Sequence, residues 1–251
     1  MIPLTVEEIA ALAPGRLEGE GEVTGMQIDS RRIEPGDLFV AVGAGAEFLG
    51  AAREAGAAAT LVPDDAHAAL AAIGGAVRDR SRARVVGVTG STGKTSTKDI
   101  LAALCAPHAR TIANERSFNA ELGVPLTLCR LEPDTEVCIV ELGMRGFGQI
   151  AELCAFARPE IGVITSIGPV HLELVGSVDG VARSKSELLA ALPPGGVAVV
   201  PAVATELDPY LRDDLDVRRV GDPDELEVGE SELSFSFRGV RVRFPFTARH
   251  Q

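Results

Sequence analysis

The segment with the clearest chemistry is a glycine-rich loop at residues 89–95, Thr-Gly-Ser-Thr-Gly-Lys-Thr. It lies between an apolar run at 85–88 and a helix expected at about 94–104, so backbone N–H groups and a helix N-terminus can face a phosphate. The full G-x-x-x-x-G-K-[ST] pattern fails because Val88 occupies its first position, and the shorter G-x-x-G-K-T remains. Lys94 would reach the β- and γ-phosphates of a nucleotide, and the Thr95 hydroxyl would bind Mg²⁺. The loop therefore predicts a phosphate-binding site with the candidate residues Gly90, Ser91, Thr92, Gly93, Lys94, Thr95 and Ser96.

Lysine is scarce in this chain. Of the 24 basic residues only Lys94, Lys98 and Lys185 are lysines, and all the others are arginines. Because arginine serves wherever a generic positive charge is needed, a lysine that remains is expected to do something that arginine cannot. This scarcity argues against the alternative that the loop is an ordinary glycine-rich turn with an incidental lysine.

Glu141 is the candidate metal ligand that follows from position. It ends an apolar strand expected at 137–140, so it lies at the carboxyl edge of the sheet, where ligands bind in folds of this kind. A carboxylate there can hold Mg²⁺ against the phosphates of a nucleotide. From position alone, an ordinary strand-end carboxylate is an equal alternative.

The elements that must position these residues form two groups. Residues 1–82 are expected to form a small N-terminal α/β domain, which opens with a helix-capping box at Thr5 and Glu8. Its other strands and helices are expected at 23–28, 38–42, 47–56, 59–62 and 65–78. A polar stretch at 78–84 marks the boundary, because a new β-loop-α pattern begins after it.

Residues 83–251 are expected to form a P-loop-containing central domain with a mostly parallel, doubly wound sheet. Strands are expected at 85–88, 137–140, 161–165 and 197–200, and helices at 94–104, 148–156 and 177–192. Near the C-terminal end, residues 226–246 alternate apolar and polar side chains around Arg238 and Gly239, which predicts a β-hairpin.

Composition excludes several classes of protein. The formal charge of −12 and the scattered basic residues argue against a nucleic-acid or anionic-membrane partner. Acidic residues stand where a signal peptide would carry positive charge, and no apolar run is long enough to cross a bilayer, so a cytoplasmic protein is expected. Four cysteines without C-x-x-C spacing predict buried, reduced thiols rather than a metal site.

Several spaced motifs carry a family resemblance. Residues 87–97, which contain the nucleotide loop, resemble the ATP loop of the Mur ligases and of the related folylpolyglutamate synthases. The segment at 117–127, Ser-Phe-Asn-Ala-Glu-Leu-Gly-Val-Pro-Leu-Thr, resembles the MurF class of the Mur ligases in particular. So do Val-Glu-Leu-Gly at 140–143, Val-His-Leu-Glu at 170–173 and the run at 180–189. The motifs occur in the family's order.

The resemblance implies an ATP-dependent amide ligase of peptidoglycan precursor synthesis. In that reaction the γ-phosphoryl group of ATP passes to the terminal carboxylate of UDP-N-acetylmuramoyl-tripeptide, and the amine of D-alanyl-D-alanine attacks the acyl phosphate. The residues at the family's catalytic positions are Lys94, Glu141, His171 and Lys185. The Mg²⁺ ligands that the resemblance implies are Thr95, Glu141, His171 and Lys185.

Lys185 has a special form in the family, where the matching lysine is carbamylated. A plain ammonium beside two magnesium ions would be repelled. A neutral lysine amine can instead take up CO₂ and become an anionic oxygen ligand, which arginine cannot do. The alternative is a solvated helix lysine.

Substrate contacts are expected in two places. Asp29, Ser30 and Arg31 resemble part of the N-terminal domain shared by the MurE and MurF classes, which holds uridine diphosphate, so Ser30 and Arg31 are candidates. A second group follows a strand-like Thr-Ile at 111–112 and matches the family's substrate segment, namely Asn114, Ser117 and Asn119.

The family's third, C-terminal domain closes over ATP and has no counterpart in these residues, so the chain alone, expected to be a monomer, should bind its ligands without joining them. Three alternatives remain open. A MurE-type ligase would add an amino acid, a truncated non-catalytic module would only bind the UDP-sugar and ATP, and a P-loop kinase would phosphorylate a stable acceptor.

Overall fold

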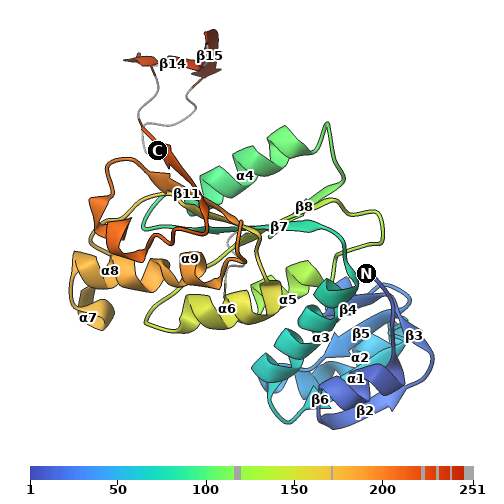
Figure 1. The fold of residues 1–251 in the computed structure, drawn as a ribbon. Helices are drawn as coiled ribbons and strands as arrows, with labels where there is room; N and C mark the ends of the chain where they lie inside the picture. The colour runs from blue at the N-terminus through green and yellow to red at the C-terminus, as the bar shows by residue number, and fades with distance from the viewer. Residues whose placement is uncertain (116–119, 171, 222–223, 230–231, 238, 246–251) are drawn as a thin grey trace.

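A computed structural model describes residues 1–115, 120–170, 172–221, 224–229, 232–237 and 239–245. Figure 1 shows two α/β parts, with the N-terminal one at the lower right and a larger one built on a central sheet. A small sheet of later strands lies apart from both. The α/β class predicted from the sequence is confirmed, because the central sheet has six strands and every pair in it is parallel.

The N-terminal part is built on a four-stranded sheet. Its strands, in spatial order, are β2 (Gly15–Gly19), β6 (Ala59–Pro63), β5 (Asp37–Val40) and β4 (Gly25–Gln27). Only the β2–β6 pair is antiparallel. A separate antiparallel pair is formed by β1 (Leu4–Thr5) and β3 (Glu22–Val23). The helical segments are α1 (Val6–Leu12), the 3-10 turns η1 (Ser30–Arg32) and η2 (Gly43–Phe48), α2 (Leu49–Glu54) and α3 (Ala66–Arg80).

Side-chain caps fix where the first helices begin. The capping box predicted for α1 is confirmed, since Thr5 Oγ1 accepts a hydrogen bond from Glu8 N at 3.2 Å and the Glu8 carboxylate accepts one from Thr5 N at 2.8 Å. Asp65 caps α3 by accepting from Ala68 N at 3.0 Å. These contacts satisfy backbone donors that the first turn leaves without a helical partner.

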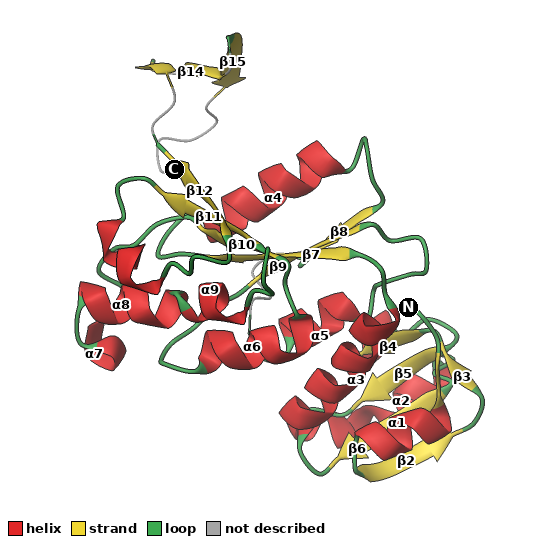
Figure 2. Ribbon diagram, in the orientation of Figure 1, coloured by secondary structure: helices red, strands yellow, loops and turns green. Residues whose placement is uncertain are grey.

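The central sheet carries the nucleotide loop. Its strands, in spatial order, are β12 (Asp216–Val220), β11 (Val197–Pro201), β10 (Ile161–Ile164), β7 (Arg84–Thr89), β9 (Val137–Glu141) and β8 (Thr111–Ala113). The helical segments are α4 (Lys94–Cys105), α5 (Gly123–Leu128), α6 (Gln149–Ala157), α7 (Leu172–Val175), α8 (Val178–Lys185), α9 (Glu187–Ala191) and the 3-10 turn η3 (Thr205–Tyr210). Figure 2 shows α4 on one face of the sheet and α5, α6, α8 and α9 on the other, as a doubly wound fold requires.

Alternation along the strands explains how both faces are covered. Val86, Val88 and Ile139 pack with Leu101 and Ala102 on the α4 side. Their neighbours in the strands, which include Val85, Cys138 and Val140, join the large core cluster on the opposite side. Because successive residues of a strand point to opposite faces, a run of apolar residues is buried on both.

The large core cluster continues from one sheet to the other. It contains Leu38 and Leu61 of the N-terminal sheet together with Leu128 of α5 and Ile150 of α6. Helix α3 makes the junction, and two glycines in its middle allow a close approach. A Cβ at Gly74 would lie 3.0 Å from the Pro125 Cα, and one at Gly75 would lie 3.4 Å from the Phe156 Cβ. The expected boundary at residue 82 falls between α3 and β7, but the division into two domains remains a prediction because the buried cluster is shared.

The structure differs from the sequence-based expectations at several elements. Strand β2 was not expected, and neither was β12, because both are edge strands whose side chains are mostly exposed and lack a continuous apolar run. The helix expected at 177–192 is two helices that meet at Ser186, whose hydroxyl donates to Arg183 O at 2.7 Å. The helix expected at 47–56 begins as a 3-10 turn at Gly43.

The predicted hairpin near the C-terminal end is confirmed. It consists of β14 (Glu232–Phe237) and β15 (Val240–Pro245), and β13 (Asp224–Val228) adds a third antiparallel strand. Across the described residues, none of the helices has the length and apolar character needed to traverse a bilayer.

All four cysteines are free thiols, and three of them are buried as predicted. Burial raises the pKa of Cys129, Cys138 and Cys154 to about 12, because the thiolate would lose its hydration. These thiols are therefore unreactive core residues.

Candidate functional site

The nucleotide loop follows β7 and is closed by two glycines that need unusual backbone geometry. Gly90 has φ +153° and Gly93, which precedes the first residue of α4, has φ +81°. A Cβ at position 90 would lie 1.9 Å from Thr165 Oγ1, so a larger residue cannot be placed there. Lys94 turns back over the loop and donates from Nζ to Gly90 O at 2.8 Å. The loop thus places a lysine and the N-terminus of a 12-residue helix beside each other.

A segment at the end of β10 supports the loop, and this contact was not predicted. Thr165 Oγ1 donates to Thr92 O at 2.5 Å, and the Ser166 hydroxyl accepts from Thr92 N at 2.9 Å. Ser91 Oγ donates to Gly168 O at 3.1 Å and accepts from Gly168 N at 2.9 Å. The signal that could have found these residues is a pair of hydroxyl side chains directly after an apolar strand, since parallel strands end at one edge of the sheet.

Glu141 and Thr95 meet at that edge. Glu141 ends β9 with 1% of its surface exposed, and its Oε2 accepts a hydrogen bond from Thr95 Oγ1 at 2.9 Å. A carboxylate and a hydroxyl are hard oxygen donors, and Mg²⁺ takes one or two such protein ligands while phosphates and water supply the rest. Among the described residues no group of three or more His, Cys, Asp and Glu side chains is arranged so that it could hold a metal ion. The pair therefore fits a magnesium–nucleotide site and does not form an all-protein metal cage.

Lys185 ends α8 and is buried, with 2% of its surface exposed. Burial, and to a smaller degree the positive charge of Lys94, lowers the pKa of its amine to about 8. Both lysines line a cavity of about 300 Å³ together with Gly90, Ser91 and Glu121. The structure thus brings Lys185 to the nucleotide loop, although the two lie about ninety residues apart in the chain. The lowered pKa makes a larger fraction of its amine neutral than in an exposed lysine.

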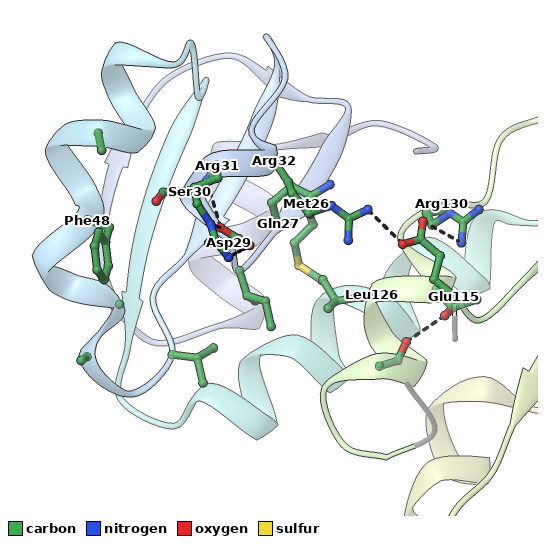
Figure 3. Close-up of a pocket in the computed structure, with 17 residues that line it drawn as sticks. Met26, Gln27, Asp29, Ser30, Arg31, Arg32, Phe48, Glu115, Leu126 and Arg130 are labelled. Atoms are coloured by element: carbon green, nitrogen blue, oxygen red, sulfur yellow. Dashed lines mark hydrogen bonds and ion pairs between the residues drawn. The ribbon is translucent and has the colours of Figure 1, made fainter. Parts of the chain in front are cut away.

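A second cavity, of about 800 Å³, lies between residues 26–51 of the N-terminal part and residues 115–130 of the central part. Figure 3 shows its lining, in which Met26, Phe48 and Leu126 provide apolar surface. Ser30 and Arg31, which were predicted to bind the nucleotide-sugar, both line it. A cavity with apolar walls and a few polar groups suits a small organic ligand with charged parts.

Arg31 is held by its own turn. Its guanidinium donates to both carboxylate oxygens of Asp29, at 2.8 and 2.7 Å, while its side chain remains 87% exposed. The hydrogen bonds from Arg31 lower the pKa of Asp29 to about 2, because they stabilise the charged carboxylate. Asp29 therefore occupies the Nε–Nη2 edge of the guanidinium and fixes the position of the group, and the predicted contact with phosphate or uracil oxygens would use its other N–H donors.

Two further arginines of this cavity were not predicted. In Figure 3 Arg32, from the N-terminal part, and Arg130, which follows α5, both point to the Glu115 carboxylate. The nitrogen–oxygen distances are 3.0 Å for Arg32 and 3.6 Å for Arg130. The Arg32–Glu115 pair joins segments 83 residues apart, so no local pattern in the sequence predicts it.

The remaining predicted residues divide into two groups. Asn114 is 2% exposed and its side-chain oxygen accepts from Glu141 N at 2.6 Å, so it connects strand ends, and substrate contact by Asn114 stays a prediction. Ser96 is exposed on the first turn of α4. Ser117, Asn119 and His171 lie outside the described residues.

Comparison with known protein families shows the family to which the chain belongs. The sequence model of the Mur ligase middle domain matches residues 88–243, which hold the nucleotide loop, Glu141 and Lys185. This chain belongs to the Mur ligase family.

Two characterised Mur ligases with similar sequences are both named UDP-N-acetylmuramoyl-tripeptide--D-alanyl-D-alanine ligase. The protein from Escherichia coli is 34% identical over 220 residues, which covers 80% of this chain and 48% of that protein. The protein from Mycobacterium bovis is 37% identical over 254 residues, covering 81% and 50%. This Mur ligase chain thus spans about half the length of the relatives it matches.

Solved structures agree with this relationship. MurF from Acinetobacter baumannii superposes with a TM-score of 0.83 at 26% identity, covering 97% of this chain and 61% of that one. MurF from Thermotoga maritima, solved in complex with ADP, gives a TM-score of 0.74 at 23% identity, covering 88% and 57%, which shows a shared fold. The Mur ligase fold predicted from the motifs is confirmed.

Proposed function

We propose that this chain is part of an ATP-dependent ligase of the MurF class, which joins D-alanyl-D-alanine to UDP-N-acetylmuramoyl-tripeptide through an acyl phosphate. The observation that carries the proposal is the meeting of Lys94, Thr95 and Glu141 at one edge of a parallel sheet, in a chain whose relatives bear that name. The reaction consumes ATP and a nucleotide-sugar, so we propose the cytoplasm as its compartment.

The loop residues would bind the nucleotide. The start of α4 would face the phosphates, whereas the N–H groups of Ser91 and Thr92 already donate to Ser166. Lys94 would exchange its bond to Gly90 O for a bond to a phosphate oxygen. Thr95 and Glu141 would hold Mg²⁺, which supplies charge neutralisation at the transferring phosphoryl group. The protein contributes mainly position and charge, because phosphoryl transfer needs little covalent chemistry from side chains.

Lys185 would act as a carbamate. Its neutral amine adds to CO₂, one proton is released, and the product is an N-carboxylate with two oxygens facing the cavity that it shares with Lys94. The lowered pKa of the amine supports this proposal, because only the neutral form reacts. His171, which the family resemblance also implies as a ligand, remains a proposal from the sequence.

The larger cavity would hold the nucleotide end of the sugar substrate. Its apolar side chains can cover a base, and Ser30 and Arg31 can donate to phosphate or uracil oxygens. The same stretch of chain contributes to both cavities, since Glu115 and Gly123 line the larger one and Ala120 and Glu121 line the smaller one. A substrate bound by its nucleotide end could therefore extend its peptide toward the phosphate loop.

Replacing Arg31 with alanine should weaken binding of the UDP-N-acetylmuramoyl substrate by roughly 10- to 150-fold, since a hydrogen bond to a charged group contributes about 1.5–3 kcal/mol. Isothermal titration calorimetry on this chain measures the effect. Arg218→Ala is the matched control, because Arg218 also pairs with an aspartate two residues earlier, at 2.7 Å, but on the edge strand β12. Equal affinity of the Arg31→Ala and unmodified proteins would refute the assignment.

The proposed reaction is tested with the complete gene product. Phosphate release should require UDP-N-acetylmuramoyl-tripeptide and D-alanyl-D-alanine together, and mass spectrometry should find the amide product. A MurE-type ligase would instead respond to a single amino acid with a shorter UDP-linked peptide. A kinase would release ADP and leave a phosphorylated acceptor without an amide, and a binding module would turn over no ATP at all.

A further inference from the structure

Lys98 is a buried lysine to which the proposed reaction gives no role. It lies on α4 with 2% of its surface exposed. Its Nζ donates to Asn114 O at 2.7 Å and pairs with Asp99 Oδ1 at 2.6 Å. Taking an ammonium group out of water is costly unless it is paired and hydrogen-bonded. The groups that Lys98 binds should therefore explain why it is buried.

What Lys98 holds is the end of strand β8. Asn114 directly follows that strand and makes contacts through both its backbone and its side chain. Its main-chain oxygen accepts a hydrogen bond from Lys98 Nζ, and its Oδ1 accepts one from Glu141 N at 2.6 Å. Asn114 is itself 2% exposed. A shift of the Asn114 backbone would therefore move the acceptor that fixes the backbone of Glu141.

The contacts close into a ring. Glu141 Oε2 accepts from Thr95 Oγ1 at 2.9 Å, and Thr95 lies three residues before Lys98 on α4, where side chains share one face of a helix. Helix α4 and the ends of strands β8 and β9 thus set the position of the Glu141 carboxylate relative to the Thr95 hydroxyl. These are the two oxygen donors that fit magnesium.

The residue type supports a specific role. The compact ammonium directs its protons to a main-chain carbonyl and a carboxylate at once, whereas a planar guanidinium is longer and donates in a fixed fork. In a chain that otherwise uses arginine, the other two lysines, Lys94 and Lys185, both line the small cavity.

We propose that Lys98 is a positioning residue of the ligase: by fixing Asn114 it sets the geometry of Glu141 and Thr95, and hence the affinity of the site for magnesium-bound nucleotide. The inference rests on the proposed function, in which Glu141 and Thr95 hold Mg²⁺. It does not require Lys98 to touch the nucleotide.

The test compares Lys98→Met with Arg78→Met. Arg78 is the matched control because its largely buried guanidinium also donates to main-chain carbonyls, at Ala157 and Arg158, and pairs with Glu160, away from the nucleotide loop. Calorimetry with a non-hydrolysable ATP analogue at increasing magnesium concentration gives the magnesium needed for half-maximal binding. Thermal unfolding gives the loss of stability for each variant.

Both substitutions should lower the melting temperature, but only Lys98→Met should raise the magnesium requirement, by about tenfold or more, as loss of a group that orients a metal ligand typically does. Affinity for the UDP-N-acetylmuramoyl substrate should stay within twofold in both variants. An unchanged magnesium requirement in folded Lys98→Met protein overturns the inference. If that variant does not fold, Lys98→Arg takes its place, and an unchanged requirement there has the same meaning.

Glu141→Ala separates this inference from the proposed function. If Glu141→Ala leaves the magnesium dependence of nucleotide binding unchanged, the metal assignment itself is wrong. If Glu141→Ala changes that dependence and the Lys98 variants do not, the metal assignment stands and Lys98 has only a structural part.

Discussion

Lys185→Arg is expected to abolish ligation by the complete gene product, although the substitution keeps a positive side chain on α8. The reason is chemical: arginine cannot form the proposed carbamate, so no anionic oxygen reaches the cavity that Lys185 shares with Lys94. Arg183→Lys, two residues earlier on the same helix, is the control for a conservative exchange. Arg183 stacks over the Phe147 ring at 5.2 Å, and lysine can retain that contact, so activity should persist.

The pKa of Lys185 sets how this modification should depend on pH. With a pKa of about 8, about one amine in ten is neutral at pH 7, against about one in three thousand at the ordinary value of 10.5. At a fixed CO₂ pressure, enzyme that has lost its carbamate should therefore regain activity faster as the pH is raised toward 8. Recovery that is independent of both pH and CO₂ would contradict the carbamate.

Two further experiments test the carbamate without relying on the rate at which activity is regained. Carbon-13 bicarbonate should give an NMR signal in the unmodified protein that is missing from Lys185→Arg. Lys185→Ala should regain part of its activity when a small carboxylate is added that can enter the vacated position. A fully active Lys185→Arg enzyme without a labelled adduct would leave Lys185 as an ordinary buried lysine.

Lys94→Ala has the second-largest expected effect. Removing the ammonium should weaken ATP binding by roughly 10- to 150-fold, the effect of a lost hydrogen bond to a charged group. ATP-dependent phosphate release should fall by about 10²- to 10³-fold, since the same group stabilises charge on the transferring phosphoryl group. Calorimetry and a phosphate-release assay measure the two quantities.

Arg84→Ala is the control for Lys94→Ala, because Arg84 is exposed at the opposite end of β7 and should affect neither quantity. Nucleotide affinity that is the same in Lys94→Ala and the unmodified protein would show that the loop does not bind phosphate in the proposed way.

The part of the site that could be predicted from the sequence is the part with a local signal. The nucleotide loop could be recognised because strand, glycines, lysine and helix follow one another within a short segment, and Glu141 because an apolar strand ends there. The support by Thr165 and Ser166 could not, because these residues contact the loop from a neighbouring parallel strand more than seventy residues later.

The burial of Lys98 and the ion pairs of the cavity arginines could not be predicted from the sequence either. The sequence showed that Lys98 was one of few lysines, but only the fold shows that its ammonium is enclosed between α4 and the end of β8. Arg31 could be selected as a ligand residue, whereas its orientation by Asp29 and the approach of Arg32 and Arg130 to Glu115 depend on how the segments pack. Edge strands β2 and β12 were missed because sheet edges need few apolar side chains.

The close contact of α3 with α5 has a consequence for which substrates can react. Because Gly74 meets Pro125 without room for a side chain, α3 lies directly against α5, and this close packing opposes sliding of the N-terminal sheet along the central part. Under the proposed function, a nucleotide-sugar anchored in the larger cavity must reach the phosphate loop with its own peptide. A peptide too short to span the distance from the larger cavity to the phosphate loop would leave its terminal carboxylate out of reach of ATP.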